Sequence, residues 1–166
     1  MFVNTDIKKK EKIDIVALFR EVCGGFRAPS GKVIKVLFFP LEEHMEVMAD
    51  QSQMVFLMNT MLLNSSRFAP ANSTVKIFAE RMSDNAVIRV IDKGVGVPDD
   101  VMPHLFEKIE NDQEGTNLHL VADIVKSHGG TIKGESNVGG GTVFTITLPL
   151  VPEMIEEAVM MDDSRS

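Results

Sequence analysis

The chain has 166 residues, of which 44% are hydrophobic and 25% are charged, and its formal net charge at pH 7 is -7. This length and composition are typical of one globular domain that can bury a proper core. The acidic balance argues against nonspecific nucleic-acid binding as the main role, because a phosphate backbone attracts clustered Lys and Arg. The single cysteine, Cys23, permits no internal disulfide and fits a reducing compartment.

The N-terminal part of the chain predicts an irregular lead-in and then a helix. Residues 1–12 are polar and charged and lack the apolar core of a signal peptide. Residues 13–26 predict an amphipathic helix with Asp14 as its N-cap and Gly24 and Gly25 as its stop. No segment of the sequence approaches the ~18 to 20 apolar residues of a membrane span. We therefore expect a cytoplasmic chain whose own residues make no membrane contact.

Two strand patterns precede the strongest helix of the sequence. Residues 32–39 are rich in Val, Ile and Phe and end at Pro40, which predicts a strand. Residues 42–48 carry a shorter strand pattern. Residues 50–68 then repeat Met, Leu and Phe at spacings of three, four and seven, which predicts a long helix with one apolar stripe.

Polar side chains accompany that apolar stripe. At about 100° per residue, Asn64 falls on the stripe between Leu57 and Met61, and an amide there needs a partner. Thr60, Asn64 and Arg67 form a ridge at i, i+4 and i+7 that would line one side of any adjoining cavity. Taken alone, the helix favours a core Asn that bonds to the backbone and an Arg that reaches water.

A hairpin follows, with strands predicted at residues 74–81 and 86–92. Its second strand is apolar in both phases of the alternation, which fits an inner strand covered on both faces. Asp92 continues the buried phase, and a buried carboxylate is costly unless something donates hydrogen bonds to it. Gly94 and Gly96 follow, where the backbone can take a positive φ or admit a close neighbour. An ordinary Asp-x-Gly turn explains this segment equally well.

The second half of the chain continues the alternation of helices and strands. We expect a short helix, a polar acidic loop, a helix ended by a Gly-Gly pair, two strands joined by a Gly-rich loop, and an acidic tail that could contain one more short helix. These elements are residues 98–106, 107–114, 116–128, 131–135, 142–148 and 151–166, with the tail helix at 153–161.

Five motifs in this order resemble the ATP-binding domain of sensor histidine kinases, within the wider ATPase family that includes DNA gyrase, the Hsp90 chaperone and MutL. The resemblance covers about residues 12–150. The motifs are similar to the asparagine box at residues 62–70, the first glycine box at 92–97, the phenylalanine box at 105–108, the second glycine box at 115–120 and the closing strand at 139–148.

The resemblance implies an α/β fold of the α+β two-layer sandwich type. Its sheet would be mixed but mostly antiparallel, with about five strands and about three helices on one face. Residues 13–150 would form this domain and residues 151–166 an acidic tail. The implied function is that of the ATP-binding catalytic domain of a two-component sensor histidine kinase. Such a domain transfers the γ-phosphoryl group of Mg-ATP to a histidine on a separate helical dimerisation domain and works with a response regulator.

The resemblance also implies which residues would hold the phosphate end of ATP. Asn64 would coordinate the Mg2+ that bridges the phosphates, a role that suits an amide oxygen. Arg67 stands where the family carries a basic residue facing the phosphates. Gly115 and Leu118 belong to the segment whose backbone amides would wrap the phosphates. Thr60 stands four residues before Asn64, where several family members carry a catalytic acid and many kinases carry Asn.

The other motifs imply which residues would hold the base end of ATP. Asp92 would accept a hydrogen bond from the adenine amino group, and Gly94 and Gly96 would let the base lie against the backbone. Phe106 belongs to the phenylalanine box, and the hydroxyl of Thr142 would help to hold the adenine. ATP binding would thus explain both a buried Asp and a core-facing Asn.

Departures from the family pattern leave alternatives open. Residues 115–120 keep one glycine of the second glycine box and align in two registers that differ by two residues, and residues 107–114 carry four acidic side chains that would repel phosphate. A weakly catalytic or non-catalytic module that binds a signalling partner is therefore the competing interpretation. An anti-sigma-factor serine kinase is a third, against which Thr60 counts because that family carries an acid there.

The sequence carries no phosphoacceptor motif. Its histidines show neither the His-Glu and Arg-Thr-Pro pattern of a dimerisation domain nor zinc-ligand spacing. They are His44, His104, His119 and His128. The receiving histidine is therefore expected on another domain.

Overall fold

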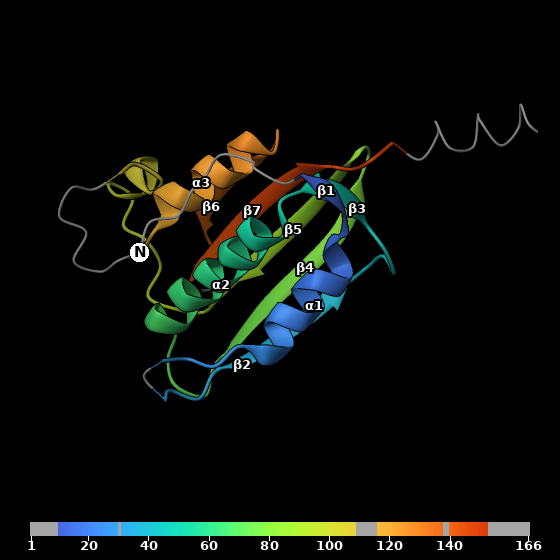
Figure 1. The fold of residues 1–166 in the computed structure, drawn as a ribbon. Coiled ribbons are helices and arrows are strands. Elements are labelled where there is room, and N and C mark those ends of the chain that lie inside the picture. Colours follow the sequence, from blue (N-terminus) through green and yellow to red (C-terminus); the bar gives the residue numbers. More distant parts are fainter. Residues whose placement is uncertain (1–9, 30, 109–115, 138–139, 153–166) are drawn as a thin grey trace, which may run out of the picture.

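Two sheets and a layer of helices make up the fold of the computed structural model (Figure 1). The structure describes residues 10–29, 31–108, 116–137 and 140–152. Within these residues the helices are α1 (Ile15–Gly25), α2 (Gln51–Phe68), α3 (Leu118–Ser127) and the 3-10 helix η1 (Met102–His104). The strands are β1 (Glu11–Asp14), β2 (Lys35–Pro40), β3 (Glu46–Ala49), β4 (Thr74–Met82), β5 (Asn85–Ile91), β6 (Thr131–Ser136) and β7 (Thr142–Pro149).

The main sheet has five strands in the order β2-β4-β5-β7-β6. Strand β2 runs parallel to β4, and the other neighbours are antiparallel. A parallel pair needs a long crossover, which α2 provides between β2 and β4. Strands β1 and β3 form a separate antiparallel pair. The predicted mixed, mostly antiparallel sheet of about five strands is confirmed.

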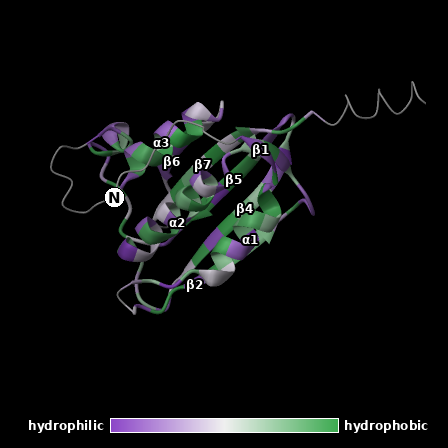
Figure 2. Ribbon diagram, viewed as in Figure 1, coloured by the Kyte–Doolittle hydropathy of each residue, from purple (hydrophilic) through white to green (hydrophobic). Residues whose placement is uncertain are grey.

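One face of the main sheet is covered by α1, α2 and α3, as Figure 1 shows. Each inner strand sends every second side chain into this layer, and on β7 the buried positions are Thr142, Phe144, Ile146 and Leu148, as its alternation predicts. Helix α2 lies between α1 and α3 and completely buries Met54, Leu57, Met58 and Met61. Figure 2 shows the apolar residues gathered where helices and sheet meet. Burial of this layer drives the two-layer fold.

The expectation that β5 is covered on both faces is wrong. Strand β5 is inner in the sheet, between β4 and β7, but the helices of the described residues pack on one of its faces only. The residues of its other face are Val87, Arg89 and Ile91, which pair across the sheet with neighbouring side chains. There Arg89 forms an ion pair with Glu80 of β4. The apolar character of this face therefore reflects cross-strand packing rather than a second helical layer.

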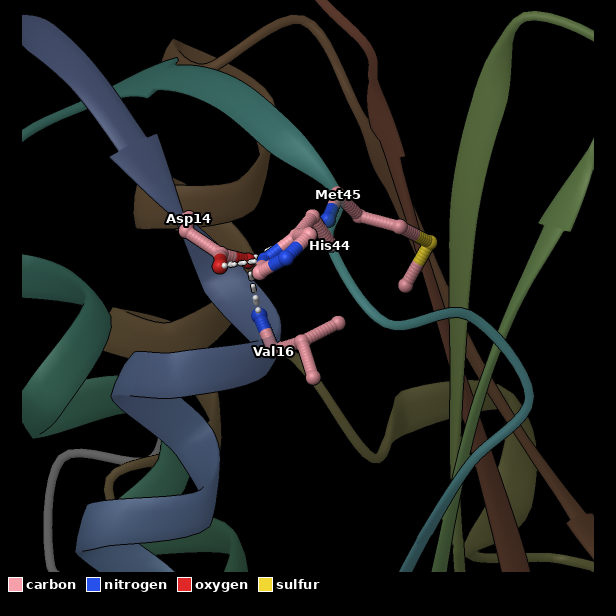
Figure 3. Close-up of polar contacts among 4 residues, drawn as sticks. All are labelled: Asp14, Val16, His44 and Met45. Carbon is pink, nitrogen blue, oxygen red and sulfur yellow. Dashed lines mark hydrogen bonds and ion pairs between the residues drawn. The ribbon is translucent and has the colours of Figure 1, made fainter.

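The start of α1 follows the predicted capping pattern (Figure 3). Asp14 Oδ1 accepts hydrogen bonds from the backbone N–H groups of Val16 and Met45, both at 3.1 Å. Asp14 Oδ2 lies 2.8 Å from His44 Nδ1. The irregular lead-in expected for residues 1–12 differs at its end, because β1 begins at Glu11 and pairs with β3. Residues 1–9 lie outside the described residues.

The second half of the chain also follows the expected order. The helix expected at residues 98–106 is limited to the short 3-10 helix η1. His128 caps α3 and is buried, with Nδ1 donating to the Ile124 carbonyl at 2.7 Å and Nε2 accepting from the Asp50 N–H at 3.2 Å. The backbone N–H of Val151 bonds to the Glu46 carbonyl at 2.8 Å, so the packed chain extends just past the expected limit at residue 150. The helix expected at 153–161 and most of the acidic loop lie outside the described residues.

No helix among the described residues is long and apolar enough to cross a membrane.

Candidate functional site

A pocket of about 340 Å³ opens between α2, the loop after β5, the start of α3 and β7. Its lining is mostly apolar, with a few polar groups, as is typical of small-molecule sites. The lining residues are Asn64, Phe68, Asp92, Val95, Gly96, Val97, Pro98, Val101, Leu105, Thr116, Leu118, Thr142 and Phe144.

Asp92 provides the carboxylate of this pocket. It follows β5 directly and is only 5% exposed, as the alternation predicts. Its Oδ1 accepts from the Gly94 N–H at 2.9 Å, and its own N–H donates to the Thr142 carbonyl at 3.1 Å. Burial raises the pKa of Asp92 above its ordinary value, and the hydrogen bond from Gly94 only partly offsets this. The pocket thus holds a desolvated acceptor that a ligand with an N–H donor would satisfy.

Two glycines allow the backbone to close around Asp92. A Cβ on Gly94 would lie 2.8 Å from the Phe68 carbonyl oxygen and 3.1 Å from Asp92 Oδ1, so a side chain there would push α2 away from the loop. Gly141 has a φ of 93°, and a Cβ there would collide with the Asp92 carbonyl. The glycines beside Asp92 therefore set the close contact between α2, the loop and β7.

Asn64 provides a second polar group, from the middle of the apolar stripe of α2. It is 6% exposed, and its Nδ2 donates to the carbonyls of Thr60 at 2.9 Å and Thr116 at 2.8 Å. Because both partners are carbonyl oxygens, they fix which end of the amide is nitrogen. Its Oδ1 is buried and has no hydrogen-bond partner among the described residues. A buried amide oxygen of this kind fits a hard cation such as Mg2+.

Among the described residues, a cation at Asn64 would find no ready-made cluster of further side-chain ligands. The described part of the chain contains no group of three or more His, Cys, Asp or Glu side chains that could hold a metal ion. Mg2+ commonly takes one or two protein oxygens and completes its shell with water and phosphate oxygens. The donor set fits a metal that arrives with a phosphate ligand and does not fit a structural metal.

The pocket brings together half of the residues expected from the sequence. Asn64, Asp92, Gly96, Leu118 and Thr142 all line it. They come from α2, the loop after β5, α3 and β7, which are far apart in the sequence.

Four of the other expected residues are described by the structure and lie outside the lining. Gly94 donates its backbone N–H to the Asp92 carboxylate. Phe106 packs edge-on against Phe144, with ring centroids 6.2 Å apart. Leu105, which precedes Phe106, lines the pocket instead. Arg67 is exposed at the end of α2. The Thr60 side chain is buried, and its carbonyl accepts from Asn64. Gly115 lies outside the described residues, and the functional roles of all these residues stay predictions.

The apolar walls of the pocket were missed in the sequence. Phe68 was assigned to the core stripe of α2 but is 39% exposed at the pocket edge. Val95 is 86% exposed and Val101 is 44% exposed. Large apolar side chains exposed around one opening mark a binding site. In the sequence, the signal for these apolar walls was the group of Val residues between Gly94 and Leu105.

These features define a class of α/β ligand-binding domain. The class has a mixed sheet with helices on one face. Its pocket lies between that layer and the ends of β5 and β7 and holds one carboxylate and one unpartnered amide oxygen. Residues 49–152 match the family described as "Histidine kinase-, DNA gyrase B-, and HSP90-like ATPase". The chain belongs to this family, and the resemblance found in its motifs is confirmed.

Proteins of similar sequence are sensor kinases. The circadian input-output histidine kinase CikA of Synechocystis sp. is 34% identical over 110 residues, which cover 61% of this chain. The sensor protein KdpD of Clostridium acetobutylicum is 30% identical over 88% of this chain, and the histidine-protein kinase BaeS of Escherichia coli is 26% identical over 90%. The matched regions span only 15%, 17% and 34% of these three proteins.

Solved structures share the fold. The catalytic domain of the histidine kinase ThkA superposes with a TM-score of 0.77 at 23% identity, covering 87% of this chain and 99% of that domain. The mycobacterial sensor histidine kinase MprB gives 0.75 at 20% identity, covering 86% of this chain and 99% of the other. Full-length ShkA in complex with AMPPNP gives 0.73 at 23% identity, covering 86% of this chain and 31% of ShkA. At these identities the likeness concerns the fold.

Proposed function

We propose that this chain is the cytoplasmic ATP-binding catalytic domain of a two-component sensor histidine kinase. The observation that carries this proposal is the placement of Asp92, Asn64 and Thr142 around one pocket. In the reaction, the bond between the β,γ-bridging oxygen and the γ-phosphorus of ATP breaks, a bond from that phosphorus to a histidine nitrogen forms, and ADP leaves. The histidine belongs to a helical dimerisation domain, from which a response regulator later receives the phosphoryl group.

The base end of the pocket suits adenine. The ionised Asp92 carboxylate accepts hydrogen bonds, which matches the exocyclic amino group of adenine and opposes the carbonyl oxygen at the same place in guanine. Phe144 and the Val residues of the loop after β5 supply apolar surface for a flat base. Thr142, buried at the start of β7, lines the same pocket and carries a hydroxyl that could bond to the base.

The phosphate end suits Mg-ATP. Asn64 Oδ1 offers the cation one ligand, and the phosphates supply others. Bound Mg2+ would neutralise charge on the transferring phosphoryl group. Arg67 stands at the end of α2 as a candidate for the phosphates, and Thr60 is the position at which a family acid would stand. The AMPPNP bound to ShkA, which has this fold, supports an ATP-like ligand.

A second candidate is an interaction module that binds nucleotide weakly and moves no phosphate. Asn117 precedes α3 with a φ of 55°, and within the described residues its side chain makes no capping hydrogen bond. The segment around it keeps one glycine, Gly115, where kinases use several to wrap phosphates. This observation favours weakened phosphate binding but leaves the base end of the pocket unchanged.

The test is a titration of the protein with a fluorescent ATP analogue, with and without Mg2+. We expect Mg2+ to tighten binding, Asp92→Ala to weaken binding in both conditions, and Asn64→Ala to remove most of the Mg2+ effect. Incubation with radiolabelled ATP and a cognate helical domain then measures transfer to histidine. Binding without transfer favours the interaction module. Failure of the wild-type protein to bind the analogue contradicts both nucleotide roles.

A further inference from the structure

Asn64 does more than leave an oxygen for a cation. Its Nδ2 reaches 2.8 Å across to the carbonyl of Thr116, which is 52 residues away in the sequence and stands two residues before α3. Thr116 and Leu118 both line the pocket, and Leu118 is 4% exposed. One side chain therefore joins the α2 wall of the pocket to its α3 wall.

This bond lies next to a residue with a left-handed backbone conformation. Asn117, between Thr116 and Leu118, holds a φ of 55°, a left-handed conformation that non-glycine residues adopt infrequently. The carbonyl of Asn117 accepts the first helical hydrogen bonds of α3, from the N–H groups of Leu120 at 3.0 Å and Val121 at 3.2 Å. The geometry of the first turn of α3 thus depends on how the chain at residues 116 and 117 is held.

We propose that Asn64 is the positioning residue of the α3 wall. Its NH2 group holds Thr116, and through it the first turn of α3, against α2, while its oxygen is kept at the cation site. The two ends of one amide then perform separable tasks. The role of the oxygen rests on the nucleotide-binding function proposed above, whereas the role of the NH2 group can be measured without any nucleotide.

The substitution Asn64→Asp separates the two ends. It keeps an oxygen for the cation but replaces the donor by an acceptor that faces the carbonyls of Thr60 and Thr116. Asn64→Ala removes both ends without adding a charge and so remains informative if the Asp variant does not fold. Asn59→Asp is the matched control, because it makes the same change on α2 beside the groove with α1, away from the pocket.

Amide hydrogen exchange of the nucleotide-free protein at pH 8 tests the role of the NH2 group. We expect exchange at Leu120 and Val121 to rise about fivefold to tenfold in both Asn64 variants. Exchange at His128, at the other end of α3, should stay within twofold of wild type, as should all three amides in Asn59→Asp. Unchanged exchange at Leu120 and Val121 overturns the proposal, and so does a uniform rise across α3 or a rise in the control.

Binding of the ATP analogue tests the separation. We expect Asn64→Asp to bind about tenfold more weakly than wild type without Mg2+ but to keep its Mg2+ effect, because the oxygen remains. Asn64→Ala should bind more weakly without Mg2+ and should also lose the Mg2+ effect. If Asn64→Asp loses only the Mg2+ effect, a positioning role is excluded. If the wild-type protein binds no analogue while the exchange effect is present, the nucleotide function fails and the positioning role of the NH2 group stands.

Discussion

Asp92 combines the role in base recognition that we propose for it with a cost in stability. Its carboxylate is desolvated, and its pKa is raised above the ordinary 3.8 by burial. A raised pKa means that the ionised form is less favourable in the folded chain than in the unfolded chain, so ionised Asp92 destabilises the fold at neutral pH. This cost is removed as the pH falls through the folded pKa.

Asp92→Asn should therefore stabilise the nucleotide-free protein while weakening ATP binding. We expect the free energy of unfolding at pH 7.5 to rise by about 1 kcal/mol, since Asn keeps an acceptor for the Gly94 N–H without the buried charge. Urea unfolding at several pH values measures this. The gain should shrink as the pH falls toward the ordinary 3.8, because the raised pKa lets the folded wild-type protein take up the proton before the unfolded chain does. Asp99→Asn, an exposed control, should change little, and an equal gain there would contradict the explanation.

The glycines beside Asp92 give a second prediction at this scale. Gly141→Ala forces a side chain onto the Asp92 carbonyl at a positive φ, so we expect a loss of about 2 kcal/mol or more in the free energy of unfolding. Gly24→Ala is the control, because a Cβ on Gly24 meets nothing within 4 Å in a helix. Thermal unfolding of both variants measures the difference in stability. Equal stability of the two variants would show that the backbone around Asp92 can move to accommodate a side chain at position 141.

Among the elements, α1 begins at a pH-dependent cluster (Figure 3). Burial raises the pKa of Asp14, but hydrogen bonds from His44, Met45 and Val16 outweigh it and leave the pKa below the ordinary 3.8. The hydrogen bond to Asp14 raises the pKa of His44 above the ordinary 6.5. The Asp14 contribution is present above 3.8 and lost at lower pH, whereas the His44 contribution is present below 6.5 and lost as the pH rises.

The pair should therefore stabilise the fold most between these two values. We expect His44→Ala to lower the urea midpoint at pH 5.5 and to have a smaller effect at pH 8.5. Asp14→Ser is the control, since it retains an N-cap oxygen for α1 but removes the charge that His44 pairs with. In the Asp14→Ser background the pH dependence of the His44 substitution should be much smaller, because only the more distant charges of Glu43 and Glu46 still raise the pKa of His44. An effect of His44→Ala that is equal at both pH values would contradict the pairing.

The end of α2 is fixed by one lysine. Lys32 Nζ donates to the carbonyls of Ser66, Arg67 and Ala69 at 3.2, 3.2 and 2.9 Å, which places a positive charge at the C-terminal end of the helix, where the macrodipole is negative. We expect Lys32→Met to reduce the free energy of unfolding by about 1 to 2 kcal/mol and to weaken nucleotide binding through Phe68, although Lys32 does not line the pocket. Lys35→Met, on the exposed side of β2, is the control in urea unfolding.

How far the elements were predictable depends on the range of the interactions that form them. Helix α2, the β4-β5 hairpin and the alternation of β7 follow from periodicity and turn residues, which act locally. Strand β1 was missed because its four residues are stabilised by pairing with β3, more than 30 positions away. The single helical layer was implied by the family resemblance, but the pattern of β5 alone suggested cover on both faces, since an apolar strand face does not reveal what covers it.

At the scale of the whole molecule, the shape of the pocket depends on how the tertiary fold brings distant elements together. Asp92 and Asn64 were identified because their polar groups interrupt apolar patterns and stand in motifs of known order. The exposed positions of Phe68 and Val95 depend on how α2, the loop after β5 and α3 meet, which no local pattern contains. The link from Asn64 to Thr116 also joins two elements only through the tertiary fold. Which polar side chains meet in the pocket was thus more predictable than its shape.

The domain as a whole should gain stability from its ligand. A ligand at 100 times its Kd that binds only the folded state adds about 2.7 kcal/mol. For a chain of this length that corresponds to a rise in Tm of about 5 to 10 °C. We expect this rise with Mg2+ and a non-hydrolysable ATP analogue in a thermal unfolding experiment. Asp92→Ala should lose most of it, and the matching GTP analogue should produce little, because its carbonyl oxygen faces the Asp92 carboxylate. Equal shifts with both analogues would show that Asp92 does not select the base.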